Sequence, residues 1–331
     1  MRHGTHRGHG AGRSRTAPAR VLETPSLAAL HRHSEADWRR IFATEPEMAV
    51  AWIGFAARSG FKAAQLVLGQ MHLDGHGVAR DAALAYAWFT KAASLGSVEA
   101  RTMVGRCHEL GWGVPVDHAV ALVHYRKAAT AGSAWGAYNV GCLLLYGTGL
   151  RRDHAAAFAA LQTAADRDHA KAMGLLGRCH EEGWGTPVDA ASAVRWYARA
   201  AEGGDAWGAL NLGLIRAEAG AAREAAVWFE RAVAMATPNC LVAIAQALEA
   251  HPDPEFARIA VMARTGLVPD PTRRLSVHLS SRGAVSMDAE TGPIGADPIR
   301  SPTKRRTAAP RRRGLKLLFI LGFYRRIRRF R

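Results

Sequence analysis

Two short Cys-His motifs are the residues of this sequence that most resemble a reactive or metal-binding centre. Cys107-His108 and Cys179-His180 are each followed by a glutamate, and thiolate, imidazole and carboxylate groups all bind zinc. The motifs lie 72 residues apart. If they occupy helical repeats two steps apart in a stack, about 20 Å separates them, whereas zinc ligands lie about 2 Å from the metal. We therefore expect buried thiols beside surface histidines, with no metal and no cofactor.

The common catalytic motifs are missing from the sequence. It contains no H-E-x-x-H, no G-x-S-x-G and no nucleotide-binding glycine loop, so we expect no catalytic residue and no enzymatic activity. The four cysteines form no C-x-x-C pair, which favours free thiols in a reducing, cytoplasmic compartment. No apolar run near the N-terminus is long enough for a signal peptide, and no run in the sequence reaches the roughly 18 residues of a transmembrane helix.

A repeat of 36 residues organises the middle of the chain. In four of its five copies a central glycine is followed at constant spacing by a G-x-G and then an aspartate, as at Gly111/Gly113 and Asp117. We expect the central glycine to lie in a first helix where a neighbouring helix leaves no room for a Cβ. The G-x-G ends that helix, and the aspartate caps a second helix. A fixed period of this length predicts a solenoid. The central glycines are Gly69, Gly105, Gly141, Gly177 and Gly213.

The repeat resembles the Sel-1-like repeat family, a relative of the tetratricopeptide repeat. The resemblance implies an all-α fold, a right-handed α/α solenoid of five 36-residue helix pairs over residues 61–237, and a scaffold that binds proteins. The third copy departs from the pattern, with Leu161 and Asp168 where an aromatic residue and a glycine are expected, and the fifth lacks the G-x-G and the aspartate. The resemblance rests on Leu68-Gly69, Gly75-His76-Gly77, Asp81, Trp88, Lys91-Ala92-Ala93, Gly96 and their copies.

The remaining segments differ from the repeats in composition. The net charge of +16 is concentrated at the two ends of the chain, and the middle is close to neutral. We expect degenerate capping helices on both sides of the solenoid and disordered segments beyond them. The predicted segments are a basic N-terminal tail (1–26), N-terminal capping helices (27–60), a C-terminal capping pair (238–265), a linker (266–310) and a basic-hydrophobic tail (311–331).

A groove along the first helices is the expected binding site. In the related tetratricopeptide arrangement, the positions two before and one after the central glycine face this groove. Here these positions hold Asn139 and Asn211, and Arg106 and Arg178. Amide and guanidinium groups bind peptide backbone and carboxylates, so we predict that the four residues bind an extended acidic or C-terminal peptide. A solvated helix face that binds nothing is the alternative, because other residue types interrupt the row.

The C-terminal tail combines an apolar block with arginines on both sides. As a helix, residues 315–324 would be about 15 Å long, half of a bilayer core. This suits insertion at an anionic membrane surface, where each nearby base contributes about 1 kcal/mol. Docking on a protein partner or on the solenoid, and nucleic-acid binding, are the alternatives. The residues predicted to make these contacts are Arg311, Arg312, Arg313, Leu315, Leu318, Phe319, Phe323, Arg325, Arg326, Arg328 and Arg329.

Two other functions stay open at this stage. One is an enzyme of the β-lactamase-like type, to which cysteine-rich members of the family have been linked, although their regular cysteine pairs are missing here. The other is a nucleic-acid-associated adaptor. Trp112 and Trp184 lie inside their G-x-G turns; we expect each to fold back onto its own repeat, with an exposed partner contact as the alternative. The sequence does not indicate an oligomeric state.

Overall fold

A computed structural model describes residues 44–266, apart from residues 250 and 252. This part of the chain forms thirteen helices and no strand. The predicted N-terminal tail, the C-terminal tail, the linker beyond Gly266 and the start of the N-terminal cap lie outside the described residues. The helices are α3 (Pro46–Arg58), α4 (Lys62–Asp74), α5 (Ala82–Ser94), α6 (Val98–Leu110), α7 (His118–Thr130), α8 (Ala134–Tyr146), α9 (His154–Ala165), α10 (Ala170–Glu182), α11 (Ala190–Glu202), α12 (Ala206–Glu218), α13 (Ala222–Met235), α14 (Pro238–Glu249) and α15 (Pro254–Thr265).

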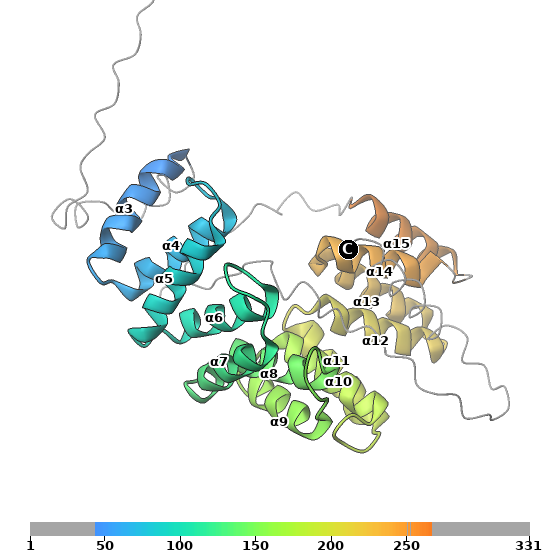
Figure 1. Cartoon of the computed structure of the whole chain (residues 1–331). Coiled ribbons are helices and arrows are strands. Elements are labelled where there is room, and N and C mark those ends of the chain that lie inside the picture. Colours follow the sequence, from blue (N-terminus) through green and yellow to red (C-terminus); the bar gives the residue numbers. More distant parts are fainter. Residues whose placement is uncertain (1–43, 250, 252, 267–331) are drawn as a thin grey trace, which may run out of the picture.

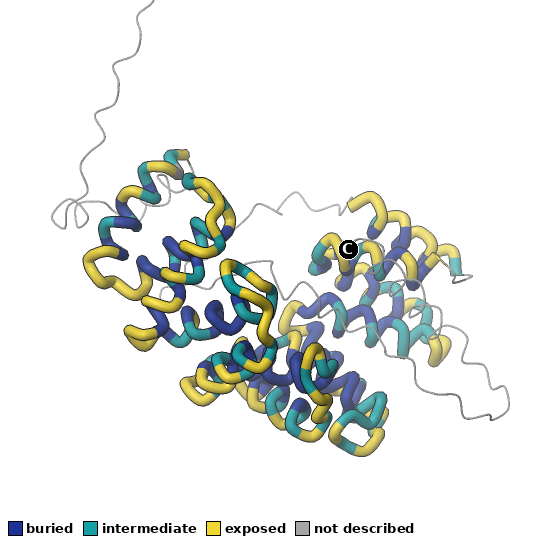
Figure 2. The backbone as a smooth tube through the Cα atoms, in the orientation of Figure 1, coloured by how far each residue is buried: buried dark blue, intermediate teal, exposed yellow. Residues whose placement is uncertain are grey.

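The helices stack as successive antiparallel pairs along a curved path. Each helix packs against the next one in the chain, and the pairs follow one another from α4/α5 to α14/α15. Figure 1 shows the resulting arc, with α3–α5 at one end and α12–α15 at the other. Buried residues follow the lines along which helices meet, and exposed residues lie in the turns and on the outer sides (Figure 2). The predicted all-helical solenoid of stacked pairs is confirmed.

The helix ends explain why each repeat folds as a pair. Gly111 ends α6 with φ of 72°, a left-handed conformation in which glycine carries no Cβ penalty. The Asp117 side chain then accepts a hydrogen bond from the backbone N–H of Val120 and caps α7. The same two devices recur in the other three G-x-G loops, at Gly75 and Asp81, Gly147 and Asp153, and Gly183 and Asp189.

The central glycines mark the closest approach of the two helices in each pair. A Cβ on Gly105 would lie 2.7 Å from the Tyr125 ring, and a Cβ on Gly177 would lie 2.7 Å from the Tyr197 ring. The third repeat keeps this packing without an aromatic residue. Its Leu161 is fully buried and lies 2.6 Å from the position of a Cβ on Gly141.

Two departures of the third repeat have a direct structural consequence. Asp168, at the position of a glycine in other repeats, has φ of 57° and is the one described non-glycine residue with positive φ. The following residue, His169, caps α10 by accepting a hydrogen bond at Nδ1 from the N–H of Ala172. The missing glycine was predicted from the sequence, whereas the histidine cap was not.

The C-terminal end of the solenoid has a shortened turn and polar contacts. The fifth pair, α12/α13, has the predicted short connection, with Gly220 at φ of 77° and no aspartate cap on α13. In the last pair, Asp253 caps α15 through the N–H of Glu255. Arg258 forms ion pairs with Glu230 and Glu255, which covers the last helix with charge.

Candidate functional site

The two predicted groove arginines are buried and stack on tryptophans. Arg106 is 9% exposed and lies over the Trp112 ring, 4.9 Å from its centroid. Arg178 is 8% exposed and lies 5.1 Å from the centroid of Trp184. The prediction that these tryptophans fold back onto their own repeats is therefore confirmed. Each indole covers the arginine in a cation–π contact, which stabilises the turn as well as the helix.

In the same two repeats a buried tyrosine is bonded to a half-buried glutamate. The Tyr125 hydroxyl donates to Glu109 at 2.5 Å, and the Tyr197 hydroxyl donates to Glu181 at 2.8 Å. Burial raises the pKa of both tyrosines well above the usual value, so that they stay protonated donors. Burial also lowers the pKa of the nearby Arg106. The second and fourth repeats thus contain matching internal polar networks.

Asn139 is the predicted groove residue with an unsatisfied group. It lies on α8, between the helices α6 and α10 that carry the two arginines, and is 2% exposed. Its Oδ1 atom is buried and accepts no hydrogen bond from any described residue. Asn211, at the same repeat position on α12, is half-buried. The four predicted groove residues are therefore largely internal, and the Oδ1 of Asn139 is a buried acceptor without a donor among the described residues.

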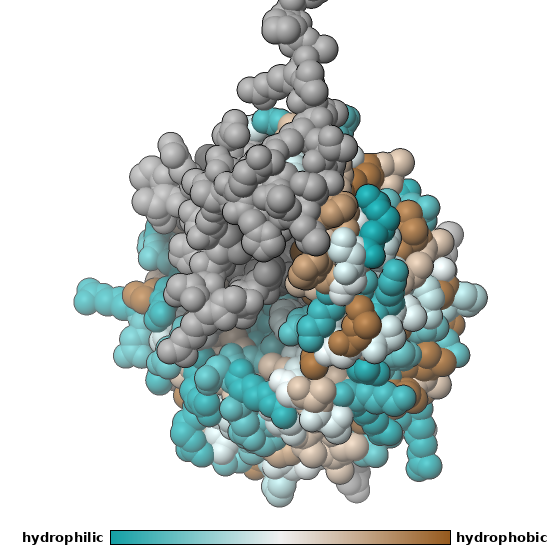
Figure 3. All heavy atoms as spheres, turned by 90° about the vertical axis from the view of Figure 1, so that its left-hand side faces the viewer, coloured by the Kyte–Doolittle hydropathy of each residue, from teal (hydrophilic) through white to brown (hydrophobic). Residues whose placement is uncertain are grey.

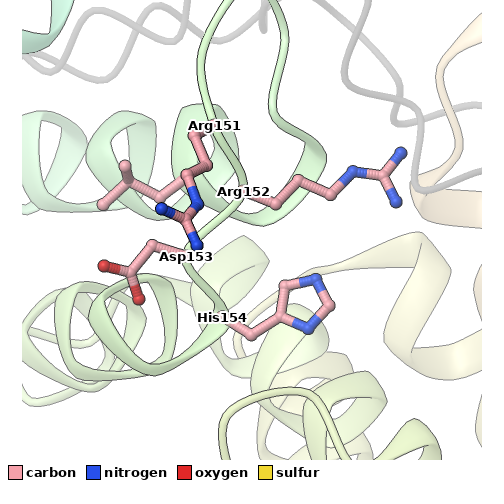
Figure 4. A pocket seen from close by; sticks show the side chains of 5 residues that line it. Arg151, Arg152, Asp153 and His154 are labelled. Atoms are coloured by element: carbon pink, nitrogen blue, oxygen red, sulfur yellow. The ribbon is translucent and has the colours of Figure 1, made fainter.

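A cavity beside the α8–α9 loop was not anticipated from the sequence. It has a volume of about 620 Å³ and is lined by Leu144, Arg151, Arg152, Asp153 and His154 (Figure 4). The sequence feature that could have indicated this cavity is a difference between the copies of the repeat. The two arginines occupy the positions at which the loops of the second and fourth repeats have Pro-Val.

The repeats themselves match a known family model. The model described as Sel1 repeat matches four times, at residues 62–97, 98–133, 136–169 and 170–205. The chain contains four Sel1 repeats. The matched segments cover the pairs from α4/α5 to α10/α11, and the α12/α13 pair extends the stack without matching the model.

Solved structures support the same fold for this Sel1 repeat protein. A Sel1 repeat protein from Oxalobacter formigenes superimposes with a TM-score of 0.60 at 24% identity, covering 70% of this chain and 98% of that one. A protective antigen present in uropathogenic Escherichia coli strains, which displays an SLR fold, superimposes with a TM-score of 0.53 at 24% identity. That match covers 69% of this chain and 51% of the antigen. No curated protein sequence matches the chain.

The cysteines of the solenoid are poorly suited to nucleophilic chemistry. All four are free and buried, and burial raises the pKa of Cys107, Cys142 and Cys179 to about 12. Neutral thiols are weak nucleophiles and weak metal ligands. Among the described residues no three potential ligands come together as a metal site. The buried thiols beside half-buried His108 and His180 agree with the expected packing role.

The visible surface of the solenoid is mixed in character. On the face drawn in Figure 3, outside the grey atoms, hydrophilic side chains surround scattered apolar ones. Among the exposed apolar residues, Val188 is 68% and Trp135 is 41% exposed. No helix in the described part of the chain has the length and apolar character required to cross a membrane. On the face shown in Figure 3, the apolar residues are scattered and form no continuous patch.

Proposed function

We propose that this Sel1 repeat protein is a non-enzymatic interaction scaffold that binds a protein or peptide segment along its first helices. A Sel1 solenoid is a general protein-interaction fold. The observation that supports binding at the middle of the array is the buried Oδ1 of Asn139, which has no donor among the described residues. A buried polar atom without a partner costs about 1–3 kcal/mol. A backbone N–H of a bound peptide would remove this cost, with Arg106, Arg178 and Asn211 framing the contact.

Two other functions have less support in the described residues. A cysteine-dependent enzyme needs an accessible thiolate, whereas the thiols here are buried with raised pKa values. A nucleic-acid adaptor needs a basic face, whereas the excess of bases is concentrated at the two ends of the chain and the repeats are close to neutral.

A peptide selection tests the scaffold function without a known partner. The intact protein is used to select peptides from a random display library, and the affinity of the selected peptides is measured for the Asn139→Ala variant. We expect a loss of about five- to tenfold, because one amide contact is removed. Gln162→Ala is the matched control, since Gln162 lies on the second helix of the same repeat and bonds to Asp166. Failure to select any peptide, or equal affinity of the Asn139→Ala variant, would refute the proposal.

We propose further that the C-terminal tail holds the scaffold at an anionic membrane surface on the cytoplasmic side. The support is the sequence itself, an apolar block between clusters of arginine from Arg311 to Arg331. Flotation with anionic vesicles compares the full chain with a chain ending at Pro310. Flotation of the full chain alone, retained at raised salt, is expected. If neither chain floats, the tail must be tested against acidic proteins and nucleic acid.

A further inference from the structure

We propose that Arg101, His124 and Lys127 form a binding site for a phosphoryl group carried by the scaffold's partner protein. This inference rests on the proposed scaffold function and names one chemical group that the partner presents. The three residues lie on α6 and α7, the two helices of the second repeat. Arg101 and His124 are half-buried, and Lys127 is exposed.

Positive groups surround His124. His124 and Lys127 are three residues apart on α7 and therefore lie on one side of this helix, and Arg101 lies in the first turn of α6, which packs against α7. Burial lowers the pKa of His124, and three groups lower it further, those of His108, Arg101 and Lys127. The His108 ring lies 5.9 Å from the His124 ring. No carboxylate is among the described groups that act on His124, so this surface favours an anion.

The fold leaves most donors of this site unused. The Nδ1 of His124 is buried without a partner, whereas its Nε2 is not buried and has no partner among the described residues. Arg101 donates from Nη2 to the carbonyl of Ala93 at 3.1 Å, which orients the guanidinium and leaves its other N–H groups unbonded to described residues. The ammonium of Lys127 makes no hydrogen bond or ion pair within the described part of the chain. Two cations and an imidazole are therefore available on neighbouring helices.

The fourth repeat shows that the solenoid does not need these polar groups for packing. At the positions of Arg101 and His124 it has Met173 and Trp196. The cation that it keeps, Arg199, lies over the Trp196 ring, 4.6 Å from the centroid. The fourth repeat thus folds with an apolar contact and a covered cation where the second repeat has a cluster of donors, and packing alone does not account for the cluster.

A phosphoryl group fits this cluster better than other anions do. A phosphorylated side chain carries a charge of about −1.5 to −2 near pH 7 and three strong acceptor oxygens. The site can supply one donor group to each of these oxygens, whereas a carboxylate offers one charge and two oxygens. A nucleic acid needs a row of cationic contacts, whereas the repeats are close to neutral overall. The site is therefore suited to an isolated phosphoryl group on a protein segment.

The His124 ring reports on binding directly. The intact protein with isotope-labelled histidine is titrated near pH 7 with a short peptide that contains one phosphoserine, and NMR follows the ring signal of His124. The variant His124→Trp, which takes the fourth-repeat residue, identifies that signal. We expect a shift with a Kd on the order of 1 mM, and a rise in the pKa of His124, because a nearby anion favours the charged imidazole. The same peptide with serine should bind about tenfold more weakly.

Variants of the two cations separate a site from a general effect of charge. Lys127→Ala should weaken binding about fivefold, and so should Arg101→Met, which takes the fourth-repeat residue. Arg126→Ala is the matched control, since Arg126 is exposed on α7 but lies two residues from His124, on another side of the helix. It should leave the affinity within about twofold. Equal weakening by the control, or no shift of the His124 signal, would overturn the proposal.

Two further outcomes are decisive. Phosphoinositide vesicles that bind the intact chain more tightly than the peptide does, with an affinity lost in Lys127→Ala, would assign the site to a membrane and overturn the proposal. Loss of the His124 shift, with selected peptides that still depend on Asn139, would overturn this inference and leave the scaffold function standing.

Discussion

The second and fourth repeats are near copies of one another, and the third repeat between them keeps their glycines and aspartate cap but differs at the positions of their polar network. The copies bury an arginine under a tryptophan and a carboxylate against a tyrosine. The third repeat has Cys142 in place of the arginine, Leu161 in place of the tyrosine and Thr148 in place of the tryptophan. It also contains the unsatisfied Asn139 and the arginine-lined cavity.

This difference separates the polar groups that hold the solenoid together from those available to a ligand. In the copies, charged and aromatic residues satisfy one another within the repeat, so they contribute to folding and are withdrawn from solvent. In the third repeat the same positions hold small or apolar residues, and the Oδ1 of Asn139 has no donor among the described residues. The unsatisfied Asn139 therefore lies in a repeat whose core differs from the cores of its two neighbours.

The largest predicted effect compares the second glycines of two G-x-G loops. A Cβ on Gly185 would lie 2.2 Å from the backbone oxygen of His154, whereas a Cβ on Gly149 would lie 2.4 Å from the side chain of His118. Both residues have positive φ, but backbone cannot move aside as an imidazole ring can. We expect Gly185→Ala to lower the free energy of unfolding by about 3 kcal/mol or more, and Gly149→Ala by about 1 kcal/mol. Urea unfolding followed by circular dichroism measures both, and equal losses would contradict this account of the third loop.

The second prediction concerns two equivalent helix caps with opposite responses to pH. Burial lowers the pKa of His169 to about 4 and raises the pKa of Asp205 to about 6. His169 is therefore stabilising when neutral: its contribution is present above pH 6.5 and is lost as the pH falls towards 4. The contribution of Asp205 is fully present below pH 3.8 and is lost as the pH rises through 6. Lys171 lies near both groups and lowers both pKa values.

Serine caps at these two positions separate the two responses. When the pH falls from 7 to 4.5, protonation of His169 should lower the free energy of unfolding by about 2 kcal/mol, and protonation of Asp205 should raise it by about 2 kcal/mol. His169→Ser should abolish the first change, and Asp205→Ser should abolish the second. Serine already caps the matching positions at Ser97 and Ser133, so the helix start is kept. Unfolding free energies across this pH range give the result. If both variants changed the pH dependence in the same direction, the assignment of one of the two groups would be wrong.

The third prediction tests the internal network of the copies. Tyr125→Phe and Tyr197→Phe each remove a hydroxyl that donates to a carboxylate, and we expect each to lower the free energy of unfolding by about 1–2 kcal/mol. Tyr86→Phe is the control, because the Tyr86 hydroxyl makes only a long 3.4 Å contact with His108. Thermal unfolding of the three variants distinguishes them. A loss at Tyr86 as large as at Tyr197 would show that the carboxylate contact is not the cause.

The framework of the repeat could be predicted from spacing, whereas the state of the polar residues could not. Spacing alone predicts the central glycines, the G-x-G helix ends and the aspartate caps, because each depends on a local backbone requirement. It also located the departures at Leu161 and Asp168. The burial of Arg106 and Arg178 depends on where two tryptophans fold, and the cavity lies beside a loop in which Thr148 takes the place of the tryptophan. Both features depend on how side chains from different segments pack together, and no single motif in the sequence predicts that packing.

The smallest predicted effect concerns Asp168, whose φ of 57° is the conformation that glycine adopts elsewhere in the array. Asp168→Gly should raise the free energy of unfolding by about 0.5 kcal/mol, since the relief of a left-handed conformation exceeds the added freedom of the unfolded chain only slightly. The reverse change, Gly132→Asp at φ of 100°, should lower it by about 1 kcal/mol or more. Urea midpoints of the two variants give the comparison. If Asp168→Gly is destabilising, the aspartate side chain stabilises the third repeat by more than the cost of its left-handed backbone. Asp168 would then stabilise a repeat that lacks the internal polar contacts of its two neighbours.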